Sequence, residues 1–368
     1  ATWSVVEAGG GAVDAGGRYT APLTPGTYHL RATAAGDPAR TAEATVHVEV
    51  DGRWRTYLNL FRSLTRGADG SPLPAVSEDP ALSQGAAAHA RYLVANDTSH
   101  PDVDPSGNVH DEDPVATGFS KAGQLAARHG NVVRSEDAHM DDQRAFDAWM
   151  AGPFHALGIL DPRLARVGYA RWNQADGRGW QSAAVLDVLS GQDSAPAAGV
   201  TFPLFFPGPG AVTPLLAYPG QENPDPLAHT GCAGFAAPTG LPLVVQLGSD
   251  PAAASSPQVS DVGLRDDTGA DLEVCWFDAA TYTNPDAATQ ARARQVLDTR
   301  DAVVIIPRHP LEAGHAYTAR LTADGTPYTW TFRTAGPGPQ IEPAPGSVAP
   351  GQELDLHLAA GQGASGRI

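Results

Sequence analysis

Apolar and polar residues alternate along the first fifty residues of the chain. Within residues 26–33 and 42–50, nearly every second position is apolar. A period of two is typical of strands that bury one face and expose the other. We therefore expect a β module over residues 1–51, although this length is short for a complete sandwich of two sheets.

The period changes at Trp54. Leu58, Phe61 and Leu64 recur at helical spacing, and a second helix is expected after Asp79, which precedes a proline and can cap the helix. Further along, the pattern predicts helices near residues 121–128 and 140–150 and strands at residues 166–172 and 180–189. Residues 52–192 are therefore predicted to form an α+β domain.

Strand-like segments return after residue 200. Loops rich in proline and glycine separate apolar runs at residues 241–247, 302–306, 316–322 and 328–334. These runs predict a β-sandwich over residues 193–336. Residues 337–368 are expected to be a Pro/Gly-rich tail or the start of a further β module.

The composition narrows the choice of partners. The chain carries a formal net charge of -17, and Lys121 is its only lysine. Such a surface argues against a nucleic-acid partner, because binding to phosphates requires clustered positive charge. The excess of acidic residues suits divalent cations, and it equally suits a solvated surface that keeps the protein soluble.

The sequence also bears on location. No apolar run approaches the roughly 20 residues that a transmembrane helix needs. The chain begins at Ala1 without an initiator methionine, which fits the loss of an export signal, although a shortened chain would look the same. We expect an extracellular or cell-envelope protein whose partners are envelope components or other surface proteins.

Two cysteines are present, Cys232 and Cys275. An even number of cysteines in an exported chain suits one disulfide bond. The alternative is two separate thiols buried as small apolar groups, and Cys275 lies in an apolar run that could bury it. A disulfide is expected, and the alternative stays open.

One stretch carries a recognisable order of residues. It reads Trp149-Met-Ala-Gly-Pro-Phe-His155, then Ile159-Leu160 and Val167-Gly168. It resembles the signature of the CAP superfamily (cysteine-rich secretory, antigen 5 and pathogenesis-related proteins), in which Trp-x-x-Ser-Pro-x-His precedes an Ile-Leu turn and a Val-Gly strand. Residues 57–62 and 73–93 resemble the two helices that open the same domain. The resemblance implies an α-β-α sandwich.

The two ends resemble another class of module. The order Trp-x-Val, Gly-x-Tyr, Val-x-Val within residues 3–50 is similar to bacterial immunoglobulin-like repeats, and residues 310–334 resemble a second such module. The expected architecture is therefore multidomain: a central CAP-like domain flanked by all-β immunoglobulin-like sandwiches.

The CAP resemblance implies a cleft where two histidines and two acidic residues can meet and bind a divalent cation. His155 matches one histidine, and His110 matches the other, with His100 as its rival. Glu112 resembles one acidic member. The second belongs to a Gly-Glu-Asn motif, but this chain has Gly130 at the carboxylate position, followed by Asn131. We place Asn131 at the cleft, and Glu136 or His139 would have to substitute for the missing ligand from a loop.

A second candidate metal site lies in the loop before residue 114. Oxygen-bearing residues at relative positions one, three, five and twelve and a glycine at six imitate a calcium-binding loop. The imitation is partial, because the last ligand is aspartate rather than glutamate and no flanking helix pair is evident. An acidic loop of Asx turns is the alternative. The residues concerned are Asp102, Asp104, Ser106, Asn108 and Asp113.

No motif for a catalytic nucleophile is present in the sequence. The leading hypothesis is therefore a non-catalytic exported protein whose cleft binds a small ligand, a lipid or wall component, or a divalent cation such as zinc or calcium. A metal-assisted hydrolase that uses the His and acid residues is one alternative. A structural subunit of a surface layer or envelope complex is the other.

Overall fold

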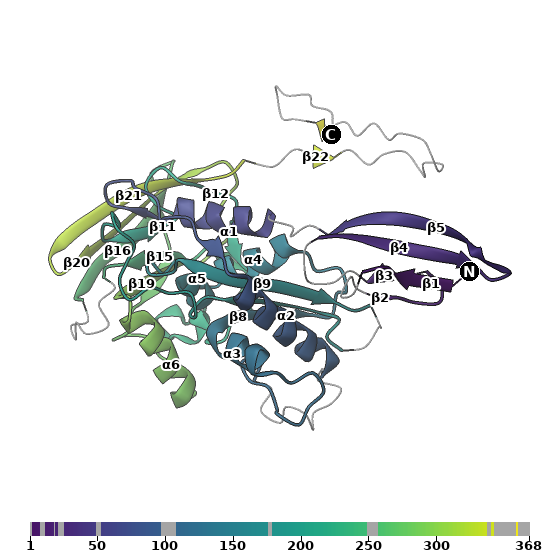
Figure 1. The fold of residues 1–368 in the computed structure, drawn as a ribbon. Helices are drawn as coiled ribbons and strands as arrows, with labels where there is room; N and C mark the ends of the chain where they lie inside the picture. Colours follow the sequence, from purple (N-terminus) through teal and green to yellow (C-terminus); the bar gives the residue numbers. More distant parts are fainter. Residues whose placement is uncertain are drawn as a thin grey trace. The chain divides into compact units, whose positions relative to one another are not determined.

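The computed structural model of the chain forms two compact units, Ala1–Thr56 and Tyr57–Ile368 (Figure 1). It describes residues 2–7, 12–17, 19–20, 26–48, 53–96, 108–175, 179–248 and 257–336, and two short strands, Gln340–Ile341 (β22) and Leu358–Ala359 (β23). The predicted boundary near residue 192 lies within the second unit.

The first unit is built from β-strands. Three of them form an antiparallel sheet in the order β1-β4-β5, and two short ones pair separately. The strands are Thr2–Val5 (β1), Ala12–Val13 (β2), Tyr19–Thr20 (β3), Gly26–Ala34 (β4) and Asp37–Val48 (β5). The alternation in the sequence therefore marks real strands. The immunoglobulin-like assignment stays a prediction.

The second unit opens with a four-stranded sheet in the order β7-β9-β10-β8, where β7 runs parallel to β9 and the other pairs are antiparallel. Its strands are Ser77–Glu78 (β7), Gly130–Ser135 (β8), Arg166–Asn173 (β9) and Ser182–Asp187 (β10). Its helices are Arg53–Leu64 (α1), Pro80–Ala95 (α2), Lys121–His129 (α3), Asp142–Ala151 (α4) and Pro153–Ile159 (α5). The bounds of α3, α4, β9 and β10 agree with the predicted helices and strands, whereas β8 and α5 were not predicted.

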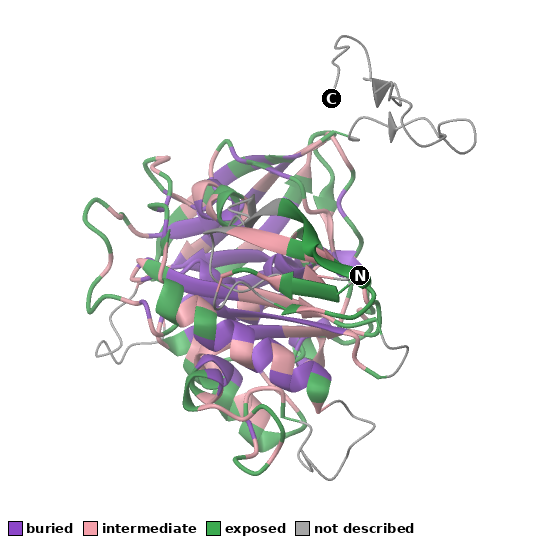
Figure 2. Cartoon of the chain, turned by 45° about the vertical axis from the view of Figure 1, so that its right-hand side comes forward, coloured by how far each residue is buried: buried purple, intermediate pink, exposed green. Residues whose placement is uncertain are grey.

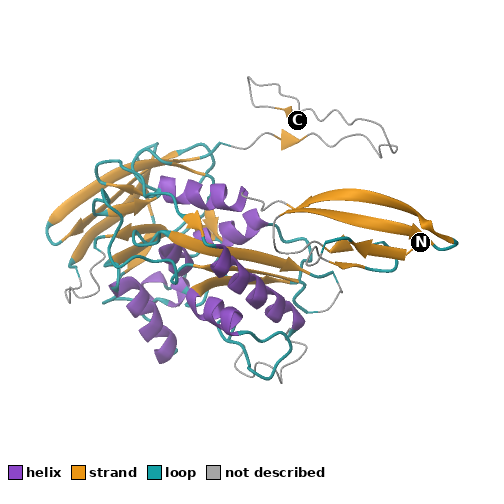
Figure 3. Cartoon of the chain, viewed as in Figure 1, coloured by secondary structure: helices purple, strands orange, loops and turns teal. Residues whose placement is uncertain are grey.

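Helices cover both faces of this sheet (Figure 3). Along β9, Ala170 and Trp172 face the core under α2, and Gly168 lies so close to Leu82 of α2 that a Cβ would be 2.1 Å from a backbone atom. Tyr169 points the other way and packs on Phe146 of α4, with ring centroids 5.1 Å apart. The period-two alternation of β9 thus gives an α-β-α sandwich.

Two five-stranded sheets follow, in the orders β18-β19-β15-β11-β6 and β12-β21-β20-β16-β17. They pack face to face, with the Phe205 and Trp330 rings 4.4 Å apart. Their strands are Arg66–Gly67 (β6), Leu204–Phe206 (β11), Val212–Thr213 (β12), Leu243–Gln246 (β15), Val259–Asp266 (β16), Asp271–Leu272 (β17), Val274–Phe277 (β18), Ala302–Pro307 (β19), Ala316–Ala323 (β20) and Thr326–Thr334 (β21). Ala217–Tyr218 (β13) and Thr239–Gly240 (β14) pair separately.

A helix absent from the sequence prediction interrupts this β region. Ala287–Asp298 (α6) begins after Asp286, whose side chain caps the helix by accepting a hydrogen bond from the Thr289 amide. Only Ala293 and Leu297 of the helix are buried, so its apolar stripe is too sparse to be recognised as a helical pattern. The expectation that residues 193–336 form strands alone is therefore wrong.

The α+β part and the β part interlock. β6, directly after α1, pairs with β11 and completes one of the two five-stranded sheets. The side chain of Gln246 on β15 donates a hydrogen bond to the carbonyl of Leu160, at a distance of 2.9 Å. Figure 2 shows buried strands running through the centre of this unit. The two parts share a core, which explains why they form one compact unit.

Asp161 anchors the junction between the two parts. Its carboxylate is fully buried and pairs with Arg163 and, across the junction, with Arg300 at 2.8 Å. Burial alone would raise the pKa of Asp161, but the hydrogen bonds from Arg163 and the charge of Arg300 hold it below its ordinary value. The neighbouring Arg62 is also buried and donates hydrogen bonds to the carbonyls of Ile159 and Leu164.

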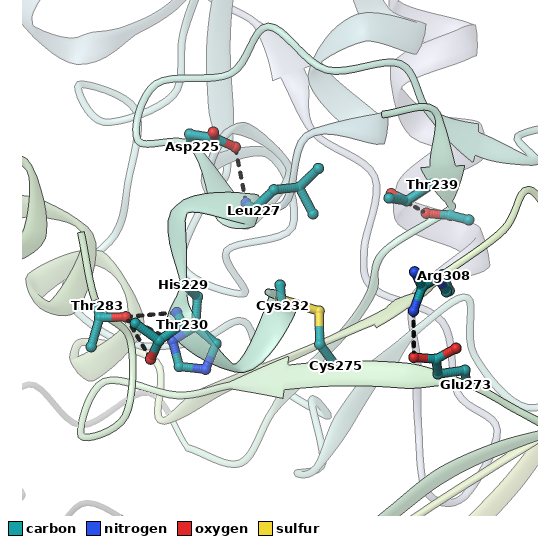
Figure 4. The surroundings of a disulfide bond; sticks show 11 residues. Asp225, Leu227, His229, Thr230, Cys232, Thr239, Glu273, Cys275, Thr283 and Arg308 are labelled. Carbon is teal, nitrogen blue, oxygen red and sulfur yellow. Dashed lines mark hydrogen bonds and ion pairs between the residues drawn. A yellow bond between two sulfur atoms is a disulfide. The ribbon is translucent and has the colours of Figure 1, made fainter. Parts of the chain in front are cut away.

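The expected disulfide bond is present. Cys232 and Cys275 are bonded with their Cα atoms 5.1 Å apart (Figure 4). Cys232 ends the short 3-10 helix Thr230–Cys232 (η2), which follows Pro226–Ala228 (η1), and Cys275 lies on β18. The bond therefore ties the irregular segment after β13 to the sheet. Among the described residues, no helix is long and apolar enough to cross a membrane.

We predict that Asp161→Asn destabilises the protein by about 3–5 kcal/mol, because it leaves Arg300 buried without its charge partner. The lowered pKa of Asp161 means that its stabilisation is complete above the ordinary value of 3.8 and is lost as the pH falls through the lower folded value. Denaturant unfolding at pH 7 measures the difference. The control is Asp193→Asn, which removes an exposed ion pair with Arg166 and should change little. Equal stability of the two variants would contradict the assigned role of Asp161.

Candidate functional site

His155 lies in the first turn of α5, directly after the junction between α4 and α5. Gly152 ends α4 and begins α5, and Pro153 occupies the first helical position, where a missing N–H costs nothing. The His155 side chain is 18% exposed. Asn131 on β8 donates a hydrogen bond to the carbonyl of His155 at 3.0 Å, which fixes the turn.

A carboxylate from outside the α+β part holds His155 in place. Glu222 Oε1 accepts hydrogen bonds from the His155 backbone amide at 2.8 Å and from its ring Nδ1 at 2.7 Å. The Glu222 side chain is 3% exposed. Its own amide donates to the hydroxyl of Tyr218, whose pKa is raised by burial and by the charge of Glu222. Because Nδ1 donates its proton to Glu222, Nε2 of the neutral ring is left as an acceptor.

Gly152 makes this approach possible. A Cβ at position 152 would lie 2.6 Å from Glu222 Oε1, closer than two atoms can pack. The CAP signature has serine at this place in its Trp-x-x-Ser-Pro-x-His motif, so the glycine is a departure from it. By contrast, a Cβ at Gly130, where the motif has its carboxylate, would lie 2.5 Å from the carbonyl oxygen of Ala126. Residue 130 has no room for a side chain.

His110 is held in the same tautomer as His155. Its Nδ1 donates a hydrogen bond to the carbonyl of Ala127 at the end of α3, at 2.9 Å. Burial lowers the pKa of His110 to about 4 and outweighs the opposing effect of that hydrogen bond. The ring is therefore neutral at pH 7, and its Nε2 is an acceptor.

His110 and His155 line one cavity of about 1230 Å³. Within the described structure, no hydrogen bond from Nε2 of either ring reaches another residue. The wall also includes Trp180, Gln221 and Asn223. Gln221 adopts φ 76°, a left-handed conformation that is uncommon for a residue with a side chain and that is often found at functional sites. The cavity therefore presents two acceptors on rigid supports.

Glu112 does not line the cavity that His110 and His155 share. Its Oε1 is 2.9 Å from Nδ1 of His89 on α2, and both side chains are fully buried. Its Oε2 accepts from the Ser120 amide, and the second ring nitrogen of His89 faces the carbonyl of Val109. Each polar atom of this pair is thus engaged in the core, and the pair fixes the loop after residue 107 to α2. The structure does not bring Glu112 to His110 and His155.

The remaining residues that the sequence suggested for the site lie in different places. Glu136 lines the cavity with an exposed side chain, and Asn131 lies under His155 as described above. Asn108 and Asp113 each accept a hydrogen bond from the amide two residues later, as Asx turns do. His100, Asp102, Asp104 and Ser106 lie outside the described residues.

The described residues do not fit a resident metal ion. A catalytic zinc site uses three protein ligands and a calcium site six or more oxygens. Over the described ranges, no group of three His, Cys, Asp or Glu side chains is placed to hold a metal. His110 and His155 supply two of the three ligands of a catalytic zinc site, and Glu222 does not add a third, because it faces Nδ1 of His155 rather than the cavity.

Comparison with known families agrees with this geometry. Residues 55–186 match the family model "CAP: Cysteine-rich secretory protein family". The chain contains a CAP domain. The match covers α1 to β10 and includes His110 and His155, whereas Glu222 lies 36 residues beyond its end. A search of curated proteins found no match.

Reasoning from sequence missed Glu222. It lies in a loop between β13 and η1 with no regular spacing to any CAP motif. The one available signal is Gly152, where the CAP signature carries serine. A lost side chain beside the cleft histidine indicates that another group occupies its space.

We predict that Glu222→Ala accelerates hydrogen exchange of the His155 amide by about tenfold or more, because the bond to a carboxylate is lost. Gly152→Ala should do the same by displacing the carboxylate. Amide exchange followed by NMR measures both. Glu273→Ala removes an exposed carboxylate on the edge of β18 and serves as the control. An unchanged His155 amide in Glu222→Ala would show that the contact does not exist in solution.

Proposed function

We propose that the CAP cavity binds a hydroxylated molecule, such as a saccharide of the cell envelope, and that it does so without catalysing a reaction. The observation that carries the proposal is the shared state of His110 and His155. Each ring donates a hydrogen bond from Nδ1–H to an acceptor of the protein. Both rings line one cavity, and among the described residues Nε2 of neither ring has a hydrogen-bond partner. Two fixed acceptors match ligand hydroxyl or amide N–H donors.

The rest of the wall supports a sugar-like ligand. Trp180 lines the wall with Arg134 over its ring at 4.7 Å, so a sugar ring would pack against the other face or the edge of the indole. Asn108, Gln221 and Asn223 bring amide groups that both donate and accept hydrogen bonds. A mixed wall with a few fixed polar groups is typical of binding sites for small molecules.

We propose further that the protein works outside the cytoplasm. A disulfide bond persists in oxidising compartments, and the bond between Cys232 and Cys275 supports that setting. The matched family carries secretory proteins in its name. An envelope saccharide is the ligand class that such a location supplies.

One observation favours hydrolysis as a second candidate. A carboxylate that holds Nδ1–H of a histidine is the arrangement by which a general base is oriented toward a water or hydroxyl proton. Glu222 holds His155 in this way at 2.7 Å. The absence of a carboxylate at position 130 therefore does not exclude catalysis, because Glu222 supplies one from the β part.

We predict that His110→Ala and His155→Ala each weaken the binding of a soluble N-acetylglucosamine oligomer by about fivefold to tenfold, the worth of one hydrogen bond. Calorimetry on the full chain measures the affinity. His309→Ala, a change of the same type at an exposed site of the β part, should bind as the wild type does. Equal affinity in all variants, or no binding at all, would contradict the saccharide proposal.

The same samples separate the two candidates. New reducing ends released from the oligomer by the wild type, and lost in Glu222→Gln, would establish hydrolysis. Binding without release of reducing ends supports the non-catalytic function.

A further inference from the structure

A second cavity, of about 640 Å³, lies on the other side of His110. It is formed where α3, β8 and α5 of the CAP domain face α6 of the β part, and α5 and α6 are in contact. The cavity is thus built from both parts of one compact unit. It shares His110, Asn108 and Asn223 with the first cavity.

Positive charge gathers on this cavity. Four arginines line it, namely Arg128, Arg163, Arg292 and Arg300. Two carboxylates partner them. Asp161 is shared between Arg163 and Arg300, and Asp111 pairs with Arg128 at 3.0 Å. The cavity therefore carries an excess of cations within a chain whose net charge is -17.

Two observations show that this positive charge is not satisfied internally. Arg292 projects from the exposed side of α6 and forms no close ion pair among the described residues, although its charge helps to lower the pKa of Asp286 at the start of the same helix. Its charge reaches His110, whose pKa it helps to lower. Arg300 is 5% exposed, and its Nε is buried without a hydrogen-bond partner among the described residues. A buried donor such as Arg300 Nε is costly unless an acceptor is supplied, whereas the exposed Arg292 is hydrated and free to approach an anion.

We propose that this arginine-lined cavity binds a small oxyanion, a phosphate or carboxylate group, with Arg292 as its principal ligand. Guanidinium groups donate paired hydrogen bonds to these planar or tetrahedral anions and stay charged at every physiological pH. Arg128 lies on the opposite wall, so an anion between α3 and α6 meets cations from both parts of the unit. The anion site uses neither His155 nor Glu222, although the two cavities share His110.

Binding of inorganic phosphate and of citrate to the full chain at low ionic strength tests the proposal, since salt screens an exposed arginine. We expect saturable binding of at least one anion, weakened about tenfold in Arg292→Gln, the loss of one charge-assisted contact. Arg333→Gln removes the same charge from an exposed site on β21 and should retain the affinity of the wild type. Binding of phosphate alone assigns a phosphate ligand, and binding of citrate alone assigns a carboxylate.

Several results would overturn the proposal. They are the absence of saturable binding of either anion, equal affinity in Arg292→Gln and the wild type, or an equal loss in Arg333→Gln, which would indicate a general surface charge effect. His155→Ala should leave anion affinity unchanged. That variant therefore distinguishes failure at this cavity from failure of the saccharide proposal.

Discussion

The carboxylate of Glu222, buried beside His155, is the contact on which the site depends. Its Oε1 accepts two hydrogen bonds from His155, whereas its Oε2 is buried without a hydrogen-bond partner among the described residues. The same bonds fix the tautomer of His155 and the direction of its Nε2. Glu222 provides the hydrogen bond to the His155 ring that is present among the described residues. The site is therefore a property of the CAP domain and the β part together.

Three further connections keep the Glu222 loop and the His155 helix in place. The disulfide bond secures the segment that follows Glu222, since Cys232 is only ten positions later and is attached to β18. Asp161 and Arg300 join the end of α5 to the β part with a buried ion pair. β6 adds a strand from the CAP region to the sheet of β11. The ion pair and the β6–β11 pairing cross between the two parts, and the disulfide bond holds the Glu222 segment within the β part.

The features that could be predicted from the sequence are those that depend on residues close together in the chain or on a simple pattern of burial. The alternation along β9 and the helical face of α1 follow directly from burial on one side, and the pairing of Cys232 with Cys275 followed from their isolation in the chain. Glu222 could not be predicted, because its role arises from folding a loop onto a helix 67 residues earlier. The assignment of Glu112 to the cleft failed because closeness in sequence did not place its carboxylate at the cavity. Glu112 is close to His110 in sequence, but α2 offers His89 as a fully buried partner, and the carboxylate pairs there.

The most direct test of the account is the tautomeric state of the two histidines, measured by nitrogen chemical shifts in labelled protein at a pH where the rings are neutral. The account predicts that His110 and His155 both carry their proton on Nδ1, with Nε2 unprotonated. It also predicts that Glu222→Ala changes the state of His155 alone. A wild-type His155 protonated on Nε2 would contradict the account, because Glu222 would then not accept its ring proton.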